Sequence, residues 1–263
     1  MSLDIECYCA AFKGRVEKTH SNFIKLKFMP DYLPPHDCPL CPRLVAFREA
    51  NRLAYPTFFN APVPSFGKLD AEFLVVGLAP GLKGANQTGR PFTGDYAGIV
   101  LYSSLLKFGF AEGVYTPDLF IRHPGEGRDP RSYLWPAVDP GLRRDDGLQL
   151  LNCRITNAVR CVPQENKPET GEIKQCNTFL KRELAAMPKL KIILSLGLIS
   201  HNAVLAATGH KAAHGKFTHG GIHKINGNLT LINSYHCSRY NINTGRLTQA
   251  MFDDVIKQVS GML

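Results

Sequence analysis

The sequence predicts an α/β fold in which helices cover both faces of a largely parallel sheet. Four short apolar stretches rich in β-branched residues alternate with longer stretches of helical periodicity. The first of them, FLVVG, runs directly into a loop of glycine and proline, as buried parallel strands do. At 263 residues, the chain is long enough for one such domain with a full hydrophobic core. Ligands of these sheets bind beyond the carboxyl ends of the strands, so the strand-end loops are the first candidates for function.

The expected elements follow from apolar spacing and from the residues at their ends. A short helix over 43–52 carries Leu44, Val45 and Phe47 near one face. A longer helix over 93–110 has Thr93 as its candidate cap and Gly109 as its stop. Strands are expected over 73–81, 148–161, 191–197 and 228–236, and further helices over 168–187, 198–209 and 244–263.

Two segments stand outside this alternation of strands and helices. Residues 1–37 are mixed and basic with a proline-rich end, and we expect an N-terminal extension of a domain that spans 38–263. Residues 122–147 are crowded with Pro, Gly, Arg and Asp, and their stretches GRDP and DPGLRRD are near mirror images. We expect an inserted surface loop there rather than part of a site.

The charge of the chain indicates a polyanionic partner. A formal net charge of +9 and a pI of about 9.2 attract nucleic acid before any specific contact forms, although solubility alone is the simpler reason for such a charge. The sequence has no run of apolar residues long enough to span a membrane and no basic flank with an apolar run at its start. We therefore expect a cytoplasmic protein without membrane contact, acting as a monomer.

Four cysteines form a pattern that can bind a metal. Cys38 and Cys41 stand in a CxxC motif, Cys161 follows a predicted strand, and Cys176 lies on the helix after it. Thiols inside cells stay reduced, which disfavours structural disulfides. Zinc and an iron–sulfur cluster fit four converging thiolates equally well, and two unrelated buried pairs are the alternative.

The loop after the first strand, GLAPGLKGANQTGRPFTGD over 77–95, is a candidate binding loop. Its glycines allow the backbone to approach a flat ligand, Phe92 can stack on that ligand, and Asp95 places a carboxylate just beyond. The loop lacks the GxxxxGK[ST] spacing of a phosphate-binding P-loop. Taken singly, Phe92 is more often a core residue and Asp95 more often a helix cap.

The loop after the last strand, over 233–251, carries cations. His236, Arg239, Tyr240, Asn241 and Arg246 give it a base, two cations and an aromatic ring. Such a set suits contacts with a phosphate backbone and a side chain inserted between bases. Alone, the loop is merely basic.

Together these stretches are far more specific than any one of them. The order CPLCPRL, GLAPGLKGANQTGRPFTGD, ITNAVRCVP with a cysteine fifteen positions on, and HCSRYNINTGRLT resembles the family 5 (type-b) uracil-DNA glycosylases of bacteria and archaea. The resemblance covers about 38–255, apart from the expected insertion.

The resemblance implies a three-layer α/β/α sandwich with a central four-stranded parallel sheet. It implies an enzyme that flips uracil, and other deaminated bases such as hypoxanthine, out of DNA and hydrolyses the N-glycosidic bond to leave an abasic site. It also implies a structural [4Fe–4S] cluster with no part in the chemistry. The implied cluster ligands are Cys38, Cys41, Cys161 and Cys176.

The resemblance also assigns roles in the reaction. His236 would stabilise the charge on the leaving base, and Asp95 would stabilise the sugar cation or orient the attacking water, with Asn157 as the third catalytic residue. The residues expected to hold the base are Gly77, Leu78, Ala79, Pro80, Gly81, Phe92, Asn157 and His236. The residues expected to contact DNA are Arg239, Tyr240, Asn241 and Arg246.

Two positions depart from related patterns. Related glycosylase families carry an acidic or amide residue that positions water at the place of Leu78. Type-b enzymes, like this chain, have leucine there, so another group must position the water. Cys237 replaces the proline of the usual HPS motif, which predicts a less rigid loop.

Two other classes of protein compete with the glycosylase hypothesis. A nucleic-acid-binding module with a metal staple would have no reason to combine Phe92, Asp95, Asn157 and His236 at strand ends. A cluster-dependent redox enzyme would need a cofactor motif, which the sequence lacks. Incubation with a uracil-containing oligonucleotide, followed by alkaline cleavage, separates these classes.

Overall fold

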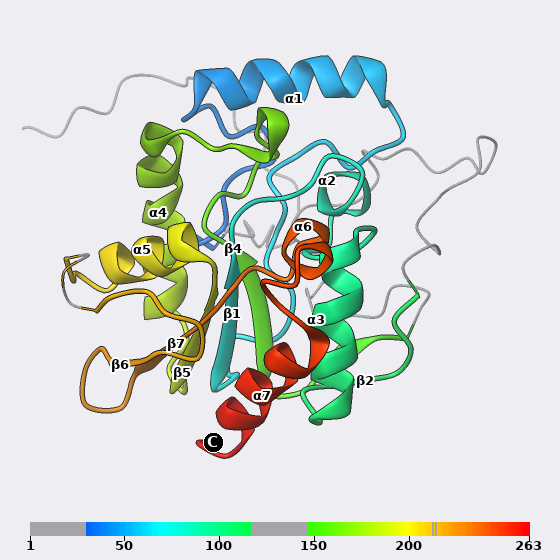
Figure 1. The fold of residues 1–263 in the computed structure, drawn as a ribbon. Coiled ribbons are helices and arrows are strands. Elements are labelled where there is room, and N and C mark those ends of the chain that lie inside the picture. Colours follow the sequence, from blue (N-terminus) through cyan, green and yellow to red (C-terminus); the bar gives the residue numbers. More distant parts are fainter. Residues whose placement is uncertain (1–29, 117–146, 212, 214) are drawn as a thin grey trace, which may run out of the picture.

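A computed structural model describes residues 30–116, 147–211, 213 and 215–263 (Figure 1). Almost all of the expected insertion over 122–147, and most of the expected extension over 1–37, lie outside the described residues. The described end of that extension lies against the domain. Leu33 is buried, and the guanidinium group of Arg154 lies 5.8 Å from the ring centre of Tyr32.

The central sheet contains four parallel strands and one antiparallel strand in the order β4-β1-β5-β7-β6. The parallel strands are β1 (Phe73–Gly77), β4 (Cys153–Asn157), β5 (Ile192–Leu196) and β7 (Thr230–Ser234), which confirms the four predicted ones. The structure adds a fifth strand at one edge of the predicted four-stranded parallel sheet. There β6 (Ile222–Lys224) pairs antiparallel with β7, and its sequence IHK has two exposed side chains and no apolar run to announce a strand.

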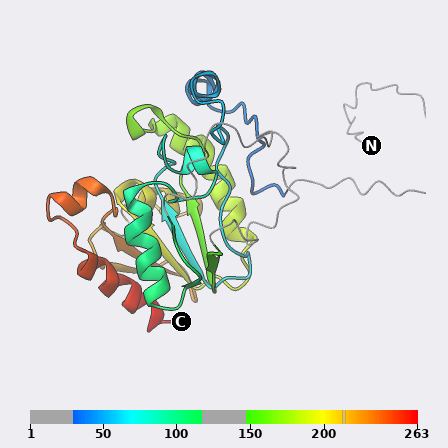
Figure 2. The ribbon, with the colours of Figure 1, turned by 90° about the vertical axis from the view of Figure 1, so that its right-hand side faces the viewer.

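Helices cover both faces of this sheet, as Figures 1 and 2 show, so the predicted sandwich is confirmed. The helices α3 (Tyr96–Lys107) and α7 (Gln249–Ser260) pack on the face that receives Phe73 and Val75 of β1. The helices α4 (Thr170–Ala185) and α5 (Leu198–Ala207) pack on the face that receives Leu74 and Val76. All five residues of β1 are buried, as expected of a strand covered on both faces. None of the helices among the described residues is long and apolar enough to cross a membrane.

The remaining helices lie toward the carboxyl ends of the strands, whereas a small second sheet lies at the opposite end, next to the start of β4 (Figure 1). The helix α1 (Pro42–Ala54) begins directly after Cys41, with a proline at its first position. The short helices are α2 (Ala85–Thr88) and α6 (Arg239–Asn243). The strands β2 (Ala111–Glu112) and β3 (Gln149–Leu150) pair antiparallel in a small second sheet.

Three predicted boundaries differ from the structure, each for a local reason. The predicted strand over 148–161 is two strands, because Asn152 adopts a left-handed conformation with φ of 49° between β3 and β4. The predicted helix over 244–263 begins only at Gln249, where the Thr248 side chain caps it. The cap of α3 is Asp95 and not Thr93, whose buried hydroxyl instead accepts a hydrogen bond from Arg90.

Candidate active site and cysteine pocket

Three of the parallel strands deliver predicted site residues to one edge of the sheet. Gly77 at the end of β1 and Asn157 at the end of β4 are direct partners in the parallel register. His236 lies two residues beyond the end of β7. The strand ends therefore bring together residues that are far apart in the sequence.

Gly77 is a glycine because of close contacts. A Cβ atom at this position would lie 2.4 Å from Asn157 Oδ1 and 2.5 Å from Phe92 Cζ, so any side chain would fill the space that these groups share. Phe92 is held there with φ of 54°, a left-handed conformation that non-glycine residues rarely adopt. Its carbonyl oxygen accepts a hydrogen bond of 3.1 Å from the hydroxyl of Tyr115.

Phe92 combines the two interpretations that the sequence left open. Its side chain is buried in the core that α3 and α7 cover, as the structural interpretation predicts. Its ring also lies against the imidazole of His236, with ring centres 6.1 Å apart and planes inclined by 28°. The ring therefore forms one wall between the core and the strand-end loops.

Asn157 carries a buried acceptor that the described protein atoms leave without a hydrogen bond. Its Oδ1 atom has no partner, although the side chain is buried beside Gly77. A buried polar atom without a partner costs about 1–3 kcal/mol. Such a cost at the end of a buried strand is typical of a group that bonds to a ligand.

Asp95 is the N-cap of α3, which confirms the structural interpretation of this residue. Its Oδ1 atom accepts a hydrogen bond of 3.1 Å from the backbone N–H of Gly98. Its Oδ2 atom faces the binding loop, where a Cβ at Gly84 would lie 2.7 Å away and one at Gly81 would lie 3.5 Å away. Burial raises the pKa of this carboxyl, and hydrogen bonds from Gly98 and Ala97 act against that rise.

His236 is neutral at physiological pH because burial lowers its pKa to about 4. Its backbone carbonyl accepts a hydrogen bond of 2.8 Å from the side-chain amide of Asn241. The next residue, Cys237, is fully buried, and its thiol donates to the carbonyl of Ala97 at 3.5 Å. The structure thus ties the loop to α3 at the residue that replaces proline.

The backbone between Gly77 and Gly81 is partly committed to the fold. The carbonyl groups of Gly77 and Leu78 accept hydrogen bonds of 2.9 Å from the N–H groups of Ala158 and Val159. The carbonyl of Gly81 accepts from the N–H groups of Gly84 and Asn86. The N–H groups of this stretch are therefore the better candidates for contacts with a ligand, and Pro80 has none to offer.

The basic loop presents its cations on aromatic rings. The guanidinium group of Arg239 lies 5.4 Å from the ring centre of Tyr96, and that of Arg246 lies 4.7 Å from the ring centre of Tyr235. Sequence reasoning missed both tyrosines, although each stands directly beside a predicted residue. Tyr240 is 72% exposed, whereas the amide of Asn241 points inward to His236.

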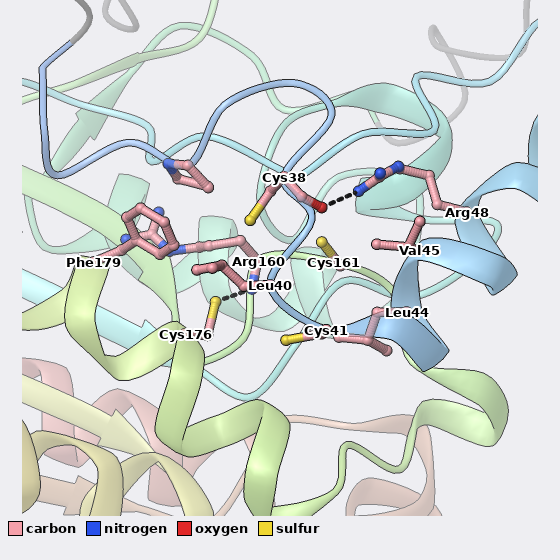
Figure 3. Close-up of a pocket in the computed structure, with 11 residues that line it drawn as sticks. Cys38, Leu40, Cys41, Leu44, Val45, Arg48, Arg160, Cys161, Cys176 and Phe179 are labelled. Carbon is pink, nitrogen blue, oxygen red and sulfur yellow. Dashed lines mark hydrogen bonds between the residues drawn. The ribbon is translucent and has the colours of Figure 1, made fainter. Parts of the chain in front are cut away.

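Four predicted cysteines line one pocket, as Figure 3 shows. Cys38 and Cys41 come from the segment that leads into α1, Cys161 from the segment after β4, and Cys176 from α4. All four are free thiols, and the sulfur of Cys176 accepts a hydrogen bond of 3.2 Å from the backbone N–H of Arg160. The structure therefore brings the four predicted cysteines to one pocket.

The thiols lie in surroundings that favour their protonated form when nothing is bound. Burial, and then the neighbouring thiols, raise the pKa of Cys161 to about 12, although Arg48 acts to lower it. Burial raises the pKa of Cys176 to about 11, with Arg160 acting to lower it. In the part of the chain that the structure describes, no three or more His, Cys, Asp or Glu side chains are arranged to hold a single metal ion.

The strand ends bring together an aromatic ring, a buried amide oxygen without a partner and an imidazole, and the family comparison adds to this description. Residues 64–260 match the family model of the uracil DNA glycosylase superfamily, and the chain belongs to this superfamily. The relatives of the chain indicate which type of uracil-DNA glycosylase it resembles. It is 38% identical to the type-5 uracil-DNA glycosylase of Thermus thermophilus over 234 residues, which are 86% of this chain and 94% of the relative.

Two further relatives bear the same description. The type-5 uracil-DNA glycosylase of Pyrobaculum aerophilum is 32% identical over 228 residues, covering 85% of this chain and 88% of the relative. That of Mycobacterium leprae is 34% identical over 228 residues, covering 84% and 89%. These matches confirm the family that the sequence motifs predicted.

Proposed function

We propose that this protein excises uracil from DNA by hydrolysing the N-glycosidic bond, leaving an abasic site for base-excision repair. The buried, unpartnered Oδ1 atom of Asn157 carries the proposal, because it lies beside Gly77 and Phe92 at the strand ends. A base within a duplex cannot reach such a pocket. The nucleotide must therefore flip out, and stacking on Phe92 would offset part of the cost of unstacking.

The lone acceptor of Asn157 explains a preference for deaminated bases. Deamination of cytosine converts a ring nitrogen that accepts hydrogen bonds into an N–H that donates one. With that ring nitrogen facing the Asn157 oxygen, uracil would donate a hydrogen bond to it, whereas the nitrogen of cytosine would not, at a cost of about 1–3 kcal/mol. Deamination of adenine to hypoxanthine makes the same change in a ring nitrogen, so we include hypoxanthine as a second substrate.

Asp95 and His236 would act on opposite ends of the breaking bond. As the bond lengthens, negative charge develops on the base and positive charge on the sugar. The neutral imidazole of His236 would donate a hydrogen bond to a carbonyl oxygen of the leaving base. The Asp95 carboxylate would stabilise the sugar cation or orient the attacking water, in place of the group that Leu78 cannot supply.

The loop beyond β7 would hold the DNA around the flipped nucleotide. Arg239 and Arg246 are exposed and would contact phosphates, and the exposed ring of Tyr240 would contact bases. We assign Asn241 a different part from the one predicted. Its amide bonds to the His236 carbonyl, so it would position the catalytic imidazole rather than contact DNA.

The cysteine pocket would hold the [4Fe–4S] cluster. Four free thiols surround one space, and the N–H bond to the Cys176 sulfur is of the kind that stabilises a cluster ligand. Cys38, Cys41, Cys161 and Cys176 would supply the four thiolates that hold the cluster. When bound, the cluster supplies a structural tie between α1, the end of β4 and α4. Anaerobically purified protein should contain iron and sulfide near four per chain, and stoichiometric zinc without iron would exclude the cluster.

The activity itself is tested with matched oligonucleotides. A duplex with one uracil, one with hypoxanthine and one with cytosine at the same position are incubated with the protein and then treated with alkali. Strand cleavage at uracil and none at cytosine is the expected result, with cleavage at hypoxanthine supporting the wider substrate range. A protein that binds the uracil duplex and leaves it intact under alkali would be a binding module.

A further inference from the structure

Arg48 places a buried positive charge beside the four thiols. It lies on α1, is 4% exposed and lines the cysteine pocket (Figure 3). Its Nη1 group donates a hydrogen bond of 3.1 Å to the carbonyl of Cys38, whereas its buried Nε has no hydrogen-bond partner. The carboxylate of Glu49, about half exposed to water, lies 3.6 Å from that nitrogen. Within the described residues, this guanidinium thus has no buried carboxylate as a partner.

The other arginine of the pocket has a buried carboxylate beside it. Arg160 forms an ion pair with the fully buried Glu183, a carboxylate that it shares with the buried Arg154. Among the described residues, Arg48 has only the exposed carboxylate of Glu49 as an ion-pair partner, at 3.6 Å. Arg48 is therefore the pocket cation whose charge no buried carboxylate compensates.

Burying a charge is costly, and a carboxylate that is half exposed to water offsets only part of that cost, so a negative group inside the pocket would stabilise Arg48 further. A cluster held by four thiolates carries net negative charge, and the guanidinium of Arg48 would face it from inside the protein. We propose that Arg48 is the counter-charge of the cluster: it retains the cluster and makes its one-electron reduction easier. This inference rests on the proposed cluster in the cysteine pocket.

The test uses the iron-loaded protein with three variants. Arg48→Met removes the charge and keeps an apolar chain, Arg48→Lys keeps the charge, and Arg52→Gln removes a partly exposed cation one turn further along the same helix. The cluster absorbance is followed after a chelator is added, and the midpoint potential is measured by film voltammetry. Circular dichroism melting of each loaded variant shows whether it is folded.

We expect Arg48→Met to lose its cluster about tenfold faster than the parent and its potential to fall by about 59 mV, the one-electron equivalent of tenfold. The potential falls because adding an electron to an already negative group is harder without the nearby cation. Arg48→Lys and Arg52→Gln should stay within about twofold of the parent rate. If Arg48→Met does not fold, Arg48→Gln takes its place in both measurements.

The outcomes separate this inference from the proposed cluster. If the parent protein contains no iron, both the proposed cluster and the proposed role of Arg48 are wrong. Parent protein with iron, but with Arg48→Met as slow in cluster loss and as high in potential as the parent, would overturn the counter-charge alone. A fall in potential as large in Arg48→Lys as in Arg48→Met would also overturn it, because the charge would then not be the cause.

Discussion

The strand-end site and the cysteine pocket are assembled in opposite ways. The strand-end site is set by the register of the sheet, which places Gly77 beside Asn157 and brings His236 to the same edge. The cysteine pocket is built from the start of α1, a post-strand segment and a helix, and these elements share a small apolar cluster apart from the two main cores. Sheet register positions the first region, whereas side-chain contacts between separate elements, such as the Arg43–Glu172 ion pair between α1 and α4, hold the second.

The two regions also differ in their unsatisfied groups. In the strand-end site, the atom without a hydrogen bond is the neutral amide oxygen of Asn157, which suits a ligand that binds reversibly. In the cysteine pocket, the atom without a hydrogen bond belongs to the charged guanidinium of Arg48, which suits a permanently bound group of opposite charge. The difference predicts that changes at the strand ends alter rates, whereas changes at the pocket alter what the protein retains.

The largest expected effect in the strand-end site comes from Asp95 and His236. Asp95→Ala and His236→Ala should each slow uracil release by about 10² to 10³, because removing a positioned electrostatic group typically costs this much. Affinity for the DNA should change little, since both groups act on charge that develops only in the transition state. Single-turnover rates at saturating enzyme measure the first quantity, and binding titrations measure the second.

Arg239→Ala is the matched comparison, because Arg239 contacts the ring of Tyr96, the residue after Asp95, but is itself exposed to solvent. It should weaken binding and lower the slope of the logarithm of affinity against that of salt concentration by about one, with little change in the saturated rate. An Asp95→Ala protein that releases uracil at nearly the parent rate would leave Asp95 as a helix cap alone. The group that handles water would then have to be sought elsewhere.

The sequence predicted the parts of the molecule that repeat a general rule. The parallel strands carry continuous apolar runs, and the four cysteines stand in recognisable spacing, so both could be located without coordinates. The edge strand β6 could not, because an exposed, three-residue strand has no periodic signal. Asp95 displaced Thr93 as the cap because the Thr93 hydroxyl is used by Arg90, a contact that local sequence does not reveal.

The features that carry the proposals lie beyond sequence reasoning for a physical reason. The sequence identified Asn157 as a candidate, but only tertiary packing determines that its oxygen lacks a partner. Arg48 belongs to an ordinary amphipathic helix by its pattern, and its burial beside the thiols depends on how α1 lies on the domain. Whether a buried atom finds a hydrogen-bond or ion-pair partner depends on segments that are distant in the sequence. Periodicity describes only residues that are close together in the sequence.

The smallest expected effect comes from a segment that belongs to neither region. Deleting Arg122 to Leu142 should leave uracil release and cluster content within about twofold of the parent, because a Pro- and Gly-rich surface insertion contributes little to either. The described flanks support this prediction. They lead from β2 and into β3, which pair antiparallel, and a Cβ at Gly113 would lie only 2.3 Å from the carbonyl oxygen of Gly147.

The flanks of the deleted segment are thus held together by the chain on either side, and a short connection can replace it. Gly113→Val in the deletion background is the contrasting variant. Its φ of 94° and the contact with Gly147 both exclude a side chain, so it should separate the flanks and lower the melting temperature where the deletion alone does not. If the deletion by itself abolishes soluble protein, the segment is integral to the fold. If it instead removes uracil release while the iron stays bound, the segment belongs to the strand-end region after all, and the division into two separately built sites must be redrawn to include it.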